Sequence, residues 1–260
     1  MVAVVIVAYV VPEDPVGAQT VKTIVQATLE EPNQKTSEIS TGDLRDILAT
    51  GSAIVFDARP PREYAMSHIP GAVNVRGKPG LSMSQYVPDA GEIIRAVDGK
   101  KASPIVLYCS GPFCGRSKRL SEELLAAGFT KVRRYQLGIP VWRALGGSTQ
   151  IELEAVAYVH QMDRSAVFID ARDPEEFQTV TVPRAVNVPA MRLEQGKDVG
   201  EVRRAKDDGR LPMEDHNTRV IVFGRDRALR RPPRRQVGSR SGAPVPTAAR
   251  VTCRGRREGQ

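Results

Sequence analysis

Cysteine and histidine are both scarce in this 260-residue chain, which contains three of each. Three cysteines at uneven spacing are too few for a disulfide framework. The spacings between these cysteines and histidines also match none of the common zinc sites. The residues concerned are Cys109, Cys114, Cys253, His68, His160 and His216. We therefore expect no metal site.

The chain also lacks an apolar run long enough to cross a bilayer. Residues 2–11 (VAVVIVAYVV) are apolar throughout, but a membrane-spanning helix needs about 20 such residues, so we expect no transmembrane span. The run has the length of the apolar region of a secretory signal, without the basic residues that usually precede it. Residues 1–37 therefore hold either a signal remnant, which predicts a periplasmic or secreted protein, or an N-terminal strand or arm of a cytoplasmic one.

Negative charge is nearly missing from residues 225–260. This tail has eleven arginines against Asp226 and Glu258, a net charge of +9, while the whole chain carries +8, so the preceding part is close to neutral. Dense arginine can bind phosphate, which would make the tail an arm for nucleic acid or an acidic partner. We favour a frame change or truncation that replaced the end of a folded unit with disordered, Arg- and Pro-rich sequence, and we do not expect a nucleic-acid partner.

What the sequence does contain is an internal repeat. Residues 55–75 are VFDARPPREYAMSHIPGAVNV, and residues 168–188 are FIDARDPEEFQTVTVPRAVNV. The two segments align without a gap at an offset of 113 residues, and ten positions carry the same residue in both. Identity of that density indicates the duplication of one supersecondary unit.

Each copy alternates short apolar runs with helical patterns. The apolar runs are too brief for helices and predict strands. Strands that alternate with helices predict a parallel sheet with helices on its faces. The expected strands are residues 53–56, 72–75, 105–108 and 131–137 in the first copy and 166–169, 185–188 and 220–223 in the second. The expected helices are one capped by Thr41 and ended by Gly51, one from about Ser117 to Gly128, and short ones at residues 141–145 and 155–162.

We therefore predict an α/β protein made of two three-layer units, each with a central, mainly parallel sheet. The first unit spans residues 38–148. The second unit, residues 149–224, is incomplete, because it lacks the loop, helix and strand that end the first copy. Residues 225–260 follow it as the basic, disordered tail.

Cys109 directly follows a buried strand and precedes a glycine-containing loop and a helix. Loop amides from Ser110 onward and the positive end of that helix can converge on the thiolate, and Arg116, Lys118 and Arg119 add positive charge. We therefore predict that the pKa of Cys109 lies below its free value of about 8.5, which would make this cysteine a nucleophile. The alternative is a buried structural cysteine that acts as a small apolar side chain.

The other two cysteines are weaker candidates. Cys114 either resolves an oxidised Cys109 by forming a disulfide within the loop or simply fills space. Cys253 lies in the predicted disordered tail and is expected to have no role.

Two segments together resemble the signatures of the rhodanese superfamily. They are residues 57–75, with DAR, EY and HIPGAVNV, and residues 108–117, YCSGPFCGRS. With the repeat, the resemblance covers residues 38–223, and the paired motifs are more specific than either alone. The resemblance implies a sulfurtransferase, in which Cys109 takes the outer sulfur of a small anionic donor such as thiosulfate and passes it to cyanide or a thiol. It also implies that no cofactor is needed, because the cysteine itself carries the sulfur.

The predicted site surrounds the cysteine loop. Arg116 is the best candidate to bind the donor, because a guanidinium suits an oxyanion, and Arg59 is expected to bear on the loop from a neighbouring strand end. Asp57 and Glu63 are expected to be structural members of a local ion pair with Arg59 that fixes the turn, and His68 is also expected to be structural. The full prediction has Cys109 as the catalytic residue and Arg59, Ser110, Gly111, Phe113, Cys114, Gly115, Arg116 and Ser117 as substrate-binding residues.

The cysteine loop departs from the usual pattern in its length. Six residues separate Cys109 from Arg116, and Pro112 removes one amide from the cradle. This spacing argues against a phosphatase or arsenate reductase, which needs five residues there to enclose a tetrahedral oxyanion. In the second copy Gly224 stands opposite Cys109, so that unit is expected to be catalytically silent. A non-catalytic sulfur-carrier or binding module is the alternative to an enzyme.

Overall fold

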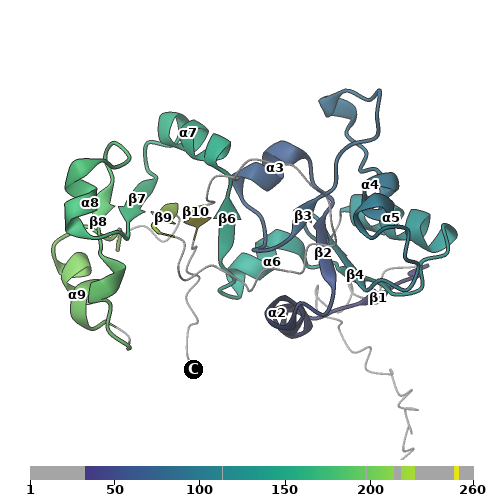
Figure 1. Ribbon diagram of the computed structural model, residues 1–260, viewed down its shortest axis with the longest axis horizontal. Coiled ribbons are helices and arrows are strands. Elements are labelled where there is room, and N and C mark those ends of the chain that lie inside the picture. The colour runs from purple at the N-terminus through teal and green to yellow at the C-terminus, as the bar shows by residue number, and fades with distance from the viewer. Residues whose placement is uncertain (1–32, 113, 197, 214–217, 226–248, 252–260) are drawn as a thin grey trace, which may run out of the picture.

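The computed structural model contains two α/β units (Figure 1). It describes residues 33–112, 114–196, 198–213, 218–225 and 249–251. Residues 2–11, interpreted above as a signal remnant or an N-terminal strand or arm, lie outside the described residues, and so does most of the basic tail. Within the described ranges, no helix is long and apolar enough to cross a membrane. The architecture is the predicted α/β fold. All four strand pairings of the first sheet are parallel, and two of the four pairings of the second are.

The first unit has a five-stranded sheet in the order β1-β5-β4-β2-β3, in which every pairing is parallel. Its strands are β1 (Ser37–Glu38), β2 (Ile54–Asp57), β3 (Val73–Asn74), β4 (Ile105–Tyr108) and β5 (Val132–Tyr135). Its helices are α2 (Thr41–Thr50), α3 (Pro61–Met66), α4 (Ala90–Ala96), α5 (Gly115–Ala126) and α6 (Gly138–Ala144), with a 3₁₀ turn, η1 (Met83–Gln85). The four predicted strands of this copy are present, whereas β1, α3 and α4 were not predicted.

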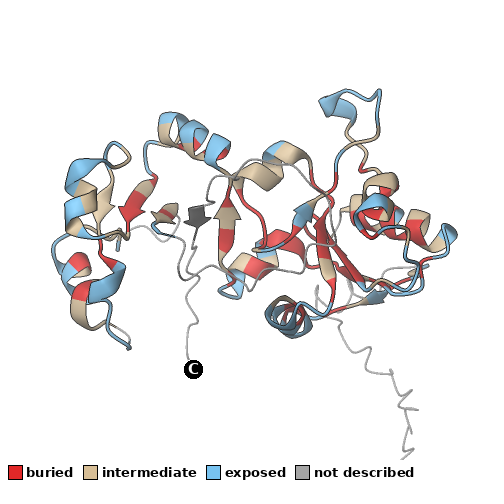
Figure 2. Ribbon diagram, in the orientation of Figure 1, coloured by how far each residue is buried: buried red, intermediate tan, exposed pale blue. Residues whose placement is uncertain are grey.

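Side-chain alternation along the strands builds an apolar core on each face of this sheet. All four residues of β4 are buried. Val106 and Tyr108 pack on the face covered by α2 and α6, while Ile105 and Leu107 pack on the face covered by α4 and α5. Burial on both faces is typical of a central parallel strand, and the buried residues lie along the middle of the unit (Figure 2). Cys109 therefore directly follows a strand whose four residues are all buried.

Helix α2 has a different cap from the one predicted. The N-cap is Ser40, not Thr41, because Ser40 and Asp43 exchange the two hydrogen bonds of a capping box. Thr41 cannot form that pair, since the residue three positions after it is Leu44. The helix ends as predicted at Gly51, which has a φ of +66°.

Helix α5 begins two residues earlier than predicted, at Gly115 instead of Ser117. Cys114 is consequently the N-cap residue of this helix. The earlier start shortens the cysteine loop and brings Cys114 to the positive end of α5.

The second unit has a five-stranded sheet in the order β6-β10-β9-β7-β8. Its strands are β6 (Thr149–Ile151), β7 (Val167–Asp170), β8 (Val186–Asn187), β9 (Val220–Phe223) and β10 (Ala249–Val251). Its helices are α7 (Leu153–Met162), α8 (Pro174–Thr179) and α9 (Gly200–Asp207), with a 3₁₀ turn, η2 (Ala190–Arg192). The pairings of β7 with β8 and with β9 are parallel, as in the first unit.

Strand β10 corrects the prediction that all of residues 225–260 are disordered. It pairs antiparallel with both β9 and β6 and takes the place next to the central strand that β5 has in the first sheet. The physical reason is that the unpaired backbone edge of a strand can accept another strand whatever its side chains are. Amino-acid composition alone does not predict such a pairing.

The second unit has the smaller core. Its two apolar clusters contain six and three buried residues in the described part of the chain, against thirteen and twelve in the first unit. Ala65 and Met66 of α3 pack against the larger of these clusters. The backbone of His68 also exchanges hydrogen bonds of 2.9 and 2.8 Å with Gln150. The first unit therefore contributes to the packing of the second.

Candidate active site

The site is anchored by a buried hydrogen-bond network between the ends of β2 and β4. Asp57 and Tyr108 are directly opposite each other in the two strands, and the Tyr108 hydroxyl donates to Asp57 Oδ2 over 2.6 Å. The backbone amide of Ile69 donates to the same hydroxyl over 3.1 Å. Burial raises the pKa of Tyr108 well above its usual value, so the hydroxyl keeps its proton and acts as a donor. The network fixes the position from which Cys109 extends.

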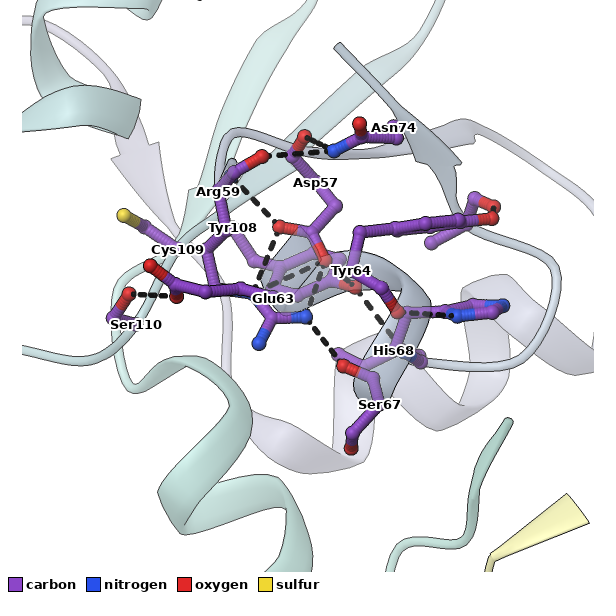
Figure 3. Close-up of polar contacts among 12 residues, drawn as sticks. Asp57, Arg59, Glu63, Tyr64, Ser67, His68, Asn74, Tyr108, Cys109 and Ser110 are labelled. Atoms are coloured by element: carbon purple, nitrogen blue, oxygen red, sulfur yellow. Dashed lines mark hydrogen bonds and ion pairs between the residues drawn. The ribbon is translucent and has the colours of Figure 1, made fainter. Parts of the chain in front are cut away.

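Arg59 belongs to this network and not to the cysteine loop, where it was expected. Its guanidinium donates to both oxygens of Asp57, with Nη2 to Oδ2 at 2.6 Å, and to the carbonyl of Ser67, also at 2.6 Å. Figure 3 shows the guanidinium turned toward Asp57 and Ser67, with the Cys109 side chain pointing away from it. The reason is that Asp57 is fully buried, and a buried carboxylate requires a charged partner.

The sulfur atoms of Cys109 and Cys114 are joined in a disulfide, with their Cα atoms 6.2 Å apart. Cys109 is only 2% exposed, whereas Cys114 is half-buried. Of the two roles considered for Cys114, this bond favours pairing with Cys109 over space filling. Disulfide sulfurs do not titrate, so a lowered pKa of the free Cys109 thiol stays a prediction.

The loop uses one of its amides differently from the predicted cradle. The amide of Cys114 donates to the carbonyl of Gly111 over 3.1 Å, which closes a turn in the loop. Pro112 has no amide hydrogen, and Phe113 lies outside the described residues. The carbonyl of Cys109 is held separately, by the amide of Ile139 at 3.3 Å.

Gly138 is a residue of the site that the sequence analysis missed. It has a φ of +64°, and a Cβ atom added there would lie 2.5 Å from the carbonyl oxygen of Cys109 and 2.6 Å from the amide nitrogen of Gly111. Only glycine allows the turn between β5 and α6 to approach the cysteine loop so closely. The available signal was a glycine directly after a predicted strand, in the sequence LGIP.

An open pocket of about 720 Å³ lies beside the cysteine loop. Arg116 stands 3.9 Å from Cys114 Sγ through its Nη1 atom, and its guanidinium carbon is 6.0 Å from the ring centre of Tyr86. Arg119 also lines the pocket, and the N-terminus of α5 opens beside it. The pocket is therefore suited to a small anion. Its lining residues are Tyr86, Ser110, Gly111, Pro112, Cys114, Gly115, Arg116 and Arg119.

The structure thus brings five predicted substrate-binding residues together at the pocket. Ser117 differs, because it is buried within α5. Tyr86 is a second residue that the sequence analysis missed. Its hydroxyl donates to the carbonyl of Val75, eleven positions earlier, over 2.6 Å, a contact that no local pattern predicts.

Glu63 contacts the cysteine loop, whereas His68 is buried against Tyr64. Glu63, predicted in an ion pair with the turn, instead accepts a hydrogen bond of 3.2 Å from the hydroxyl of Ser110 in the cysteine loop. His68 is buried against Tyr64, with ring centres 3.9 Å apart, and its Nδ1 lies 3.0 Å from the carbonyl of Tyr64. Burial lowers the pKa of His68, so its imidazole is neutral at neutral pH.

The second unit repeats the anchor without the thiol. Arg172 donates to Asp170 with the same 2.6 Å contact between Nη2 and Oδ2. Phe223 stands opposite Asp170 where the first unit has Tyr108, and the hydroxyl of Thr181 replaces the missing phenol at 2.8 Å. Gly224 then follows the strand in the place of Cys109. This unit therefore has no nucleophile at the equivalent point.

Metal binding has no support from side-chain clustering: among the described residues, no group of three or more His, Cys, Asp or Glu side chains is arranged to hold a metal ion.

Comparison with known proteins identifies the family. The rhodanese-like domain model matches residues 40–145 and 155–232. The chain is 32% identical over 126 residues to thiosulfate sulfurtransferase 16, chloroplastic, of Arabidopsis thaliana, a match that covers 47% of this chain and 99% of that protein. It is 28% identical over 106 residues to thiosulfate:glutathione sulfurtransferase of Homo sapiens, covering 40% and 90%.

A solved structure of thiosulfate sulfurtransferase from Pseudomonas aeruginosa is 22% identical and covers 72% of this chain and 36% of that one, with a TM-score of 0.36. The family assignment rests on the sequence match, which includes more than half of the chain and both copies of the repeat. The chain belongs to the rhodanese-like domain family.

Proposed function

We propose that the chain is a sulfurtransferase that moves sulfane sulfur from a small anionic donor such as thiosulfate to cyanide or a thiol through a persulfide on Cys109. The observation that carries the proposal is the position of Cys109 at the end of a fully buried central strand, beside an arginine-lined pocket. The names of the two curated relatives, both thiosulfate-dependent sulfurtransferases, support the same reaction class.

The reaction begins from the reduced loop. The Cys109 thiolate attacks the outer sulfur of thiosulfate, the sulfur–sulfur bond of the donor breaks, and sulfite leaves with the bonding electron pair. The terminal sulfur of the resulting persulfide is then attacked by the acceptor, and Cys109 leaves as the thiolate. Because the cysteine carries the sulfur through both steps, the mechanism needs no cofactor.

The pocket supplies charge and orientation for these steps. Arg116 and Arg119 offer guanidinium groups to the oxyanion of the donor and to the departing sulfite. The hydroxyl of Ser110, which also lines the pocket, donates its hydrogen bond to Glu63. The anchor of Asp57 and Tyr108 holds the end of β4, so Cys109 does not need to be positioned by the substrate.

Cys109→Ser tests the proposal. Purified protein is reduced with a dithiol, freed of the reductant, and incubated with thiosulfate and cyanide while thiocyanate is followed. We expect the wild type to turn over and Cys109→Ser to fall to the uncatalysed rate, because a hydroxyl cannot carry the sulfur. Cys253→Ser is the matched control and should retain the wild-type rate.

Thiocyanate formation that survives Cys109→Ser would refute the assignment of the nucleophile. A wild type that gains one sulfur in intact mass but never forms thiocyanate would instead identify a sulfur carrier.

A further inference from the structure

The disulfide within the cysteine loop points to a second step that the proposed sulfur transfer does not use. Cys109 and Cys114 are five positions apart, and their side chains meet across a turn that is closed by the hydrogen bond from Cys114 to Gly111. The atom that Cys114 reaches is the Sγ of Cys109. In a persulfide that atom is the inner sulfur, and it keeps the same place in the loop.

The surroundings of Cys114 favour its thiolate when the bond is reduced. Cys114 is the N-cap residue of the 12-residue helix α5, and Arg116 Nη1 lies 3.9 Å from its Sγ. A helix N-terminus and a neighbouring guanidinium both stabilise a thiolate. The thiolate is the form that attacks a sulfur–sulfur bond.

We propose that Cys114 is a resolving cysteine, and that this chain releases sulfide from the Cys109 persulfide. This step rests on the proposed function, because Cys109 must first be loaded with sulfur. The Cys114 thiolate attacks Cys109 Sγ, a bond forms between the two cysteine sulfurs, and the bond to the terminal sulfur breaks. The terminal sulfur leaves with the electron pair as hydrosulfide, and Cys109 and Cys114 become the observed disulfide.

A dithiol closes the cycle. It reduces the Cys109–Cys114 disulfide by two electrons, returns both thiols, and is itself oxidised to a disulfide. The sum is thiosulfate plus a dithiol, giving sulfite, hydrogen sulfide and the oxidised dithiol. The chain would therefore be a dithiol-dependent, sulfide-releasing enzyme, in which an external acceptor such as cyanide competes with Cys114 for the loaded sulfur.

A single-turnover experiment on the full-length protein separates this step from loading. Reduced protein, freed of thiols, receives a stoichiometric amount of thiosulfate, and sulfite, sulfide and intact mass after alkylation are followed. From the wild type we expect one equivalent each of sulfite and sulfide, and a disulfide that joins the peptides of Cys109 and Cys114. Cys253→Ser should behave in the same way.

Cys114→Ser and Cys114→Ala should keep a stable adduct of one sulfur on Cys109. They should release sulfide at least about 100-fold more slowly than the wild type, because the attack within the loop is lost. Added cyanide should then convert that adduct to thiocyanate. Sulfite without sulfide from the wild type, or sulfide released at the wild-type rate by both Cys114 variants, overturns the resolving role alone. No sulfite from the wild type overturns the proposed function and this step with it.

Discussion

At the scale of single residues, the difference between the two units lies in how a buried aspartate is satisfied. Asp57 and Asp170 are both fully buried and both paired with the arginine two positions later. The remaining hydrogen bond comes from the Tyr108 phenol in one unit and from the Thr181 hydroxyl in the other. The phenol also accepts the Ile69 amide, so it ties the strand that precedes Cys109 to the turn after α3.

We expect Tyr108→Phe to lower the free energy of unfolding of the first unit by about 1–3 kcal/mol, because it leaves buried groups on Asp57 and Ile69 without that partner. Fluorescence of Trp142 during urea unfolding measures this, since it is the one tryptophan of the chain and lies in the first unit's core. Tyr135→Phe is the control. It removes a hydroxyl whose hydrogen-bond partner is the hydroxyl of Thr41, and should cost less. A Tyr108→Phe loss no larger than that of Tyr135→Phe would contradict the anchoring role.

At the scale of elements, the turn between β5 and α6 is part of the active-site geometry although it carries no reactive group. Gly138 and Gly51 have nearly the same left-handed φ, +64° and +66°. A Cβ atom at Gly51 would meet nothing within 4 Å, whereas one at Gly138 would collide with the backbone of the cysteine loop. Substituting alanine at each glycine therefore distinguishes the energetic cost of a left-handed backbone from the additional cost of the collision at Gly138.

We expect Gly51→Ala to destabilise the first unit by about 1–2 kcal/mol and to leave thiocyanate formation unchanged. Gly138→Ala should cost about 1–3 kcal/mol more and slow thiocyanate formation by about tenfold to 100-fold, because the collision displaces Cys109. Unfolding followed by Trp142 fluorescence and the rate at saturating thiosulfate measure the two effects. Equal rates for the two variants would show that the turn does not position the loop.

Elements that depend on local patterns could be predicted from the sequence. The duplicated apolar runs predicted six strands of the two sheets besides β5, and Gly51 predicted the end of α2. The approach of Gly138 to Cys109 and the contact of Tyr86 with Val75 depend on which segments meet in space. Strand β10 was missed for the same reason, because its partners are backbone edges distant in the sequence. Arg59 pairs with a residue only two positions away, but its preference for Asp57 over the loop follows from the full burial of that carboxylate, which no local pattern shows.

At the scale of the whole molecule, the contact between the units runs through a buried histidine. The backbone of His68 pairs with Gln150, and its Nε2 lies 3.6 Å from Glu152 Oε1 at the start of α7. Burial lowers the pKa of His68 and raises that of Glu152, with Glu154 adding to the second shift. Both groups are therefore biased toward their neutral forms, so this contact is not favoured as a charged pair.

These shifts predict a pH dependence of stability. Below the ordinary histidine pKa of 6.5, the unfolded chain binds a proton that folded His68 does not, so the free energy of unfolding falls as the pH drops from about 7 toward the folded pKa, by up to about 1.4 kcal/mol per pH unit. Above that range His68 is neutral in both the folded and the unfolded chain, and its contribution to the free energy of unfolding is complete. Glu152 acts in the opposite direction, because the folded carboxyl keeps a proton that the unfolded one releases, and Glu152→Gln removes this opposing effect.

In the Glu152→Gln background, urea unfolding between about pH 5 and pH 7 should therefore show a clear loss of stability toward acid. Adding His68→Asn, whose side-chain amide can still donate to the Tyr64 carbonyl in place of Nδ1, should flatten the profile in that interval. Because the histidine lies between the units, we also expect acid to unfold the second unit first, since that unit has the smaller core. Far-UV circular dichroism, which reports both units, would then change before Trp142 fluorescence. Parallel pH profiles with and without His68 would mean that its burial does not couple protonation to folding.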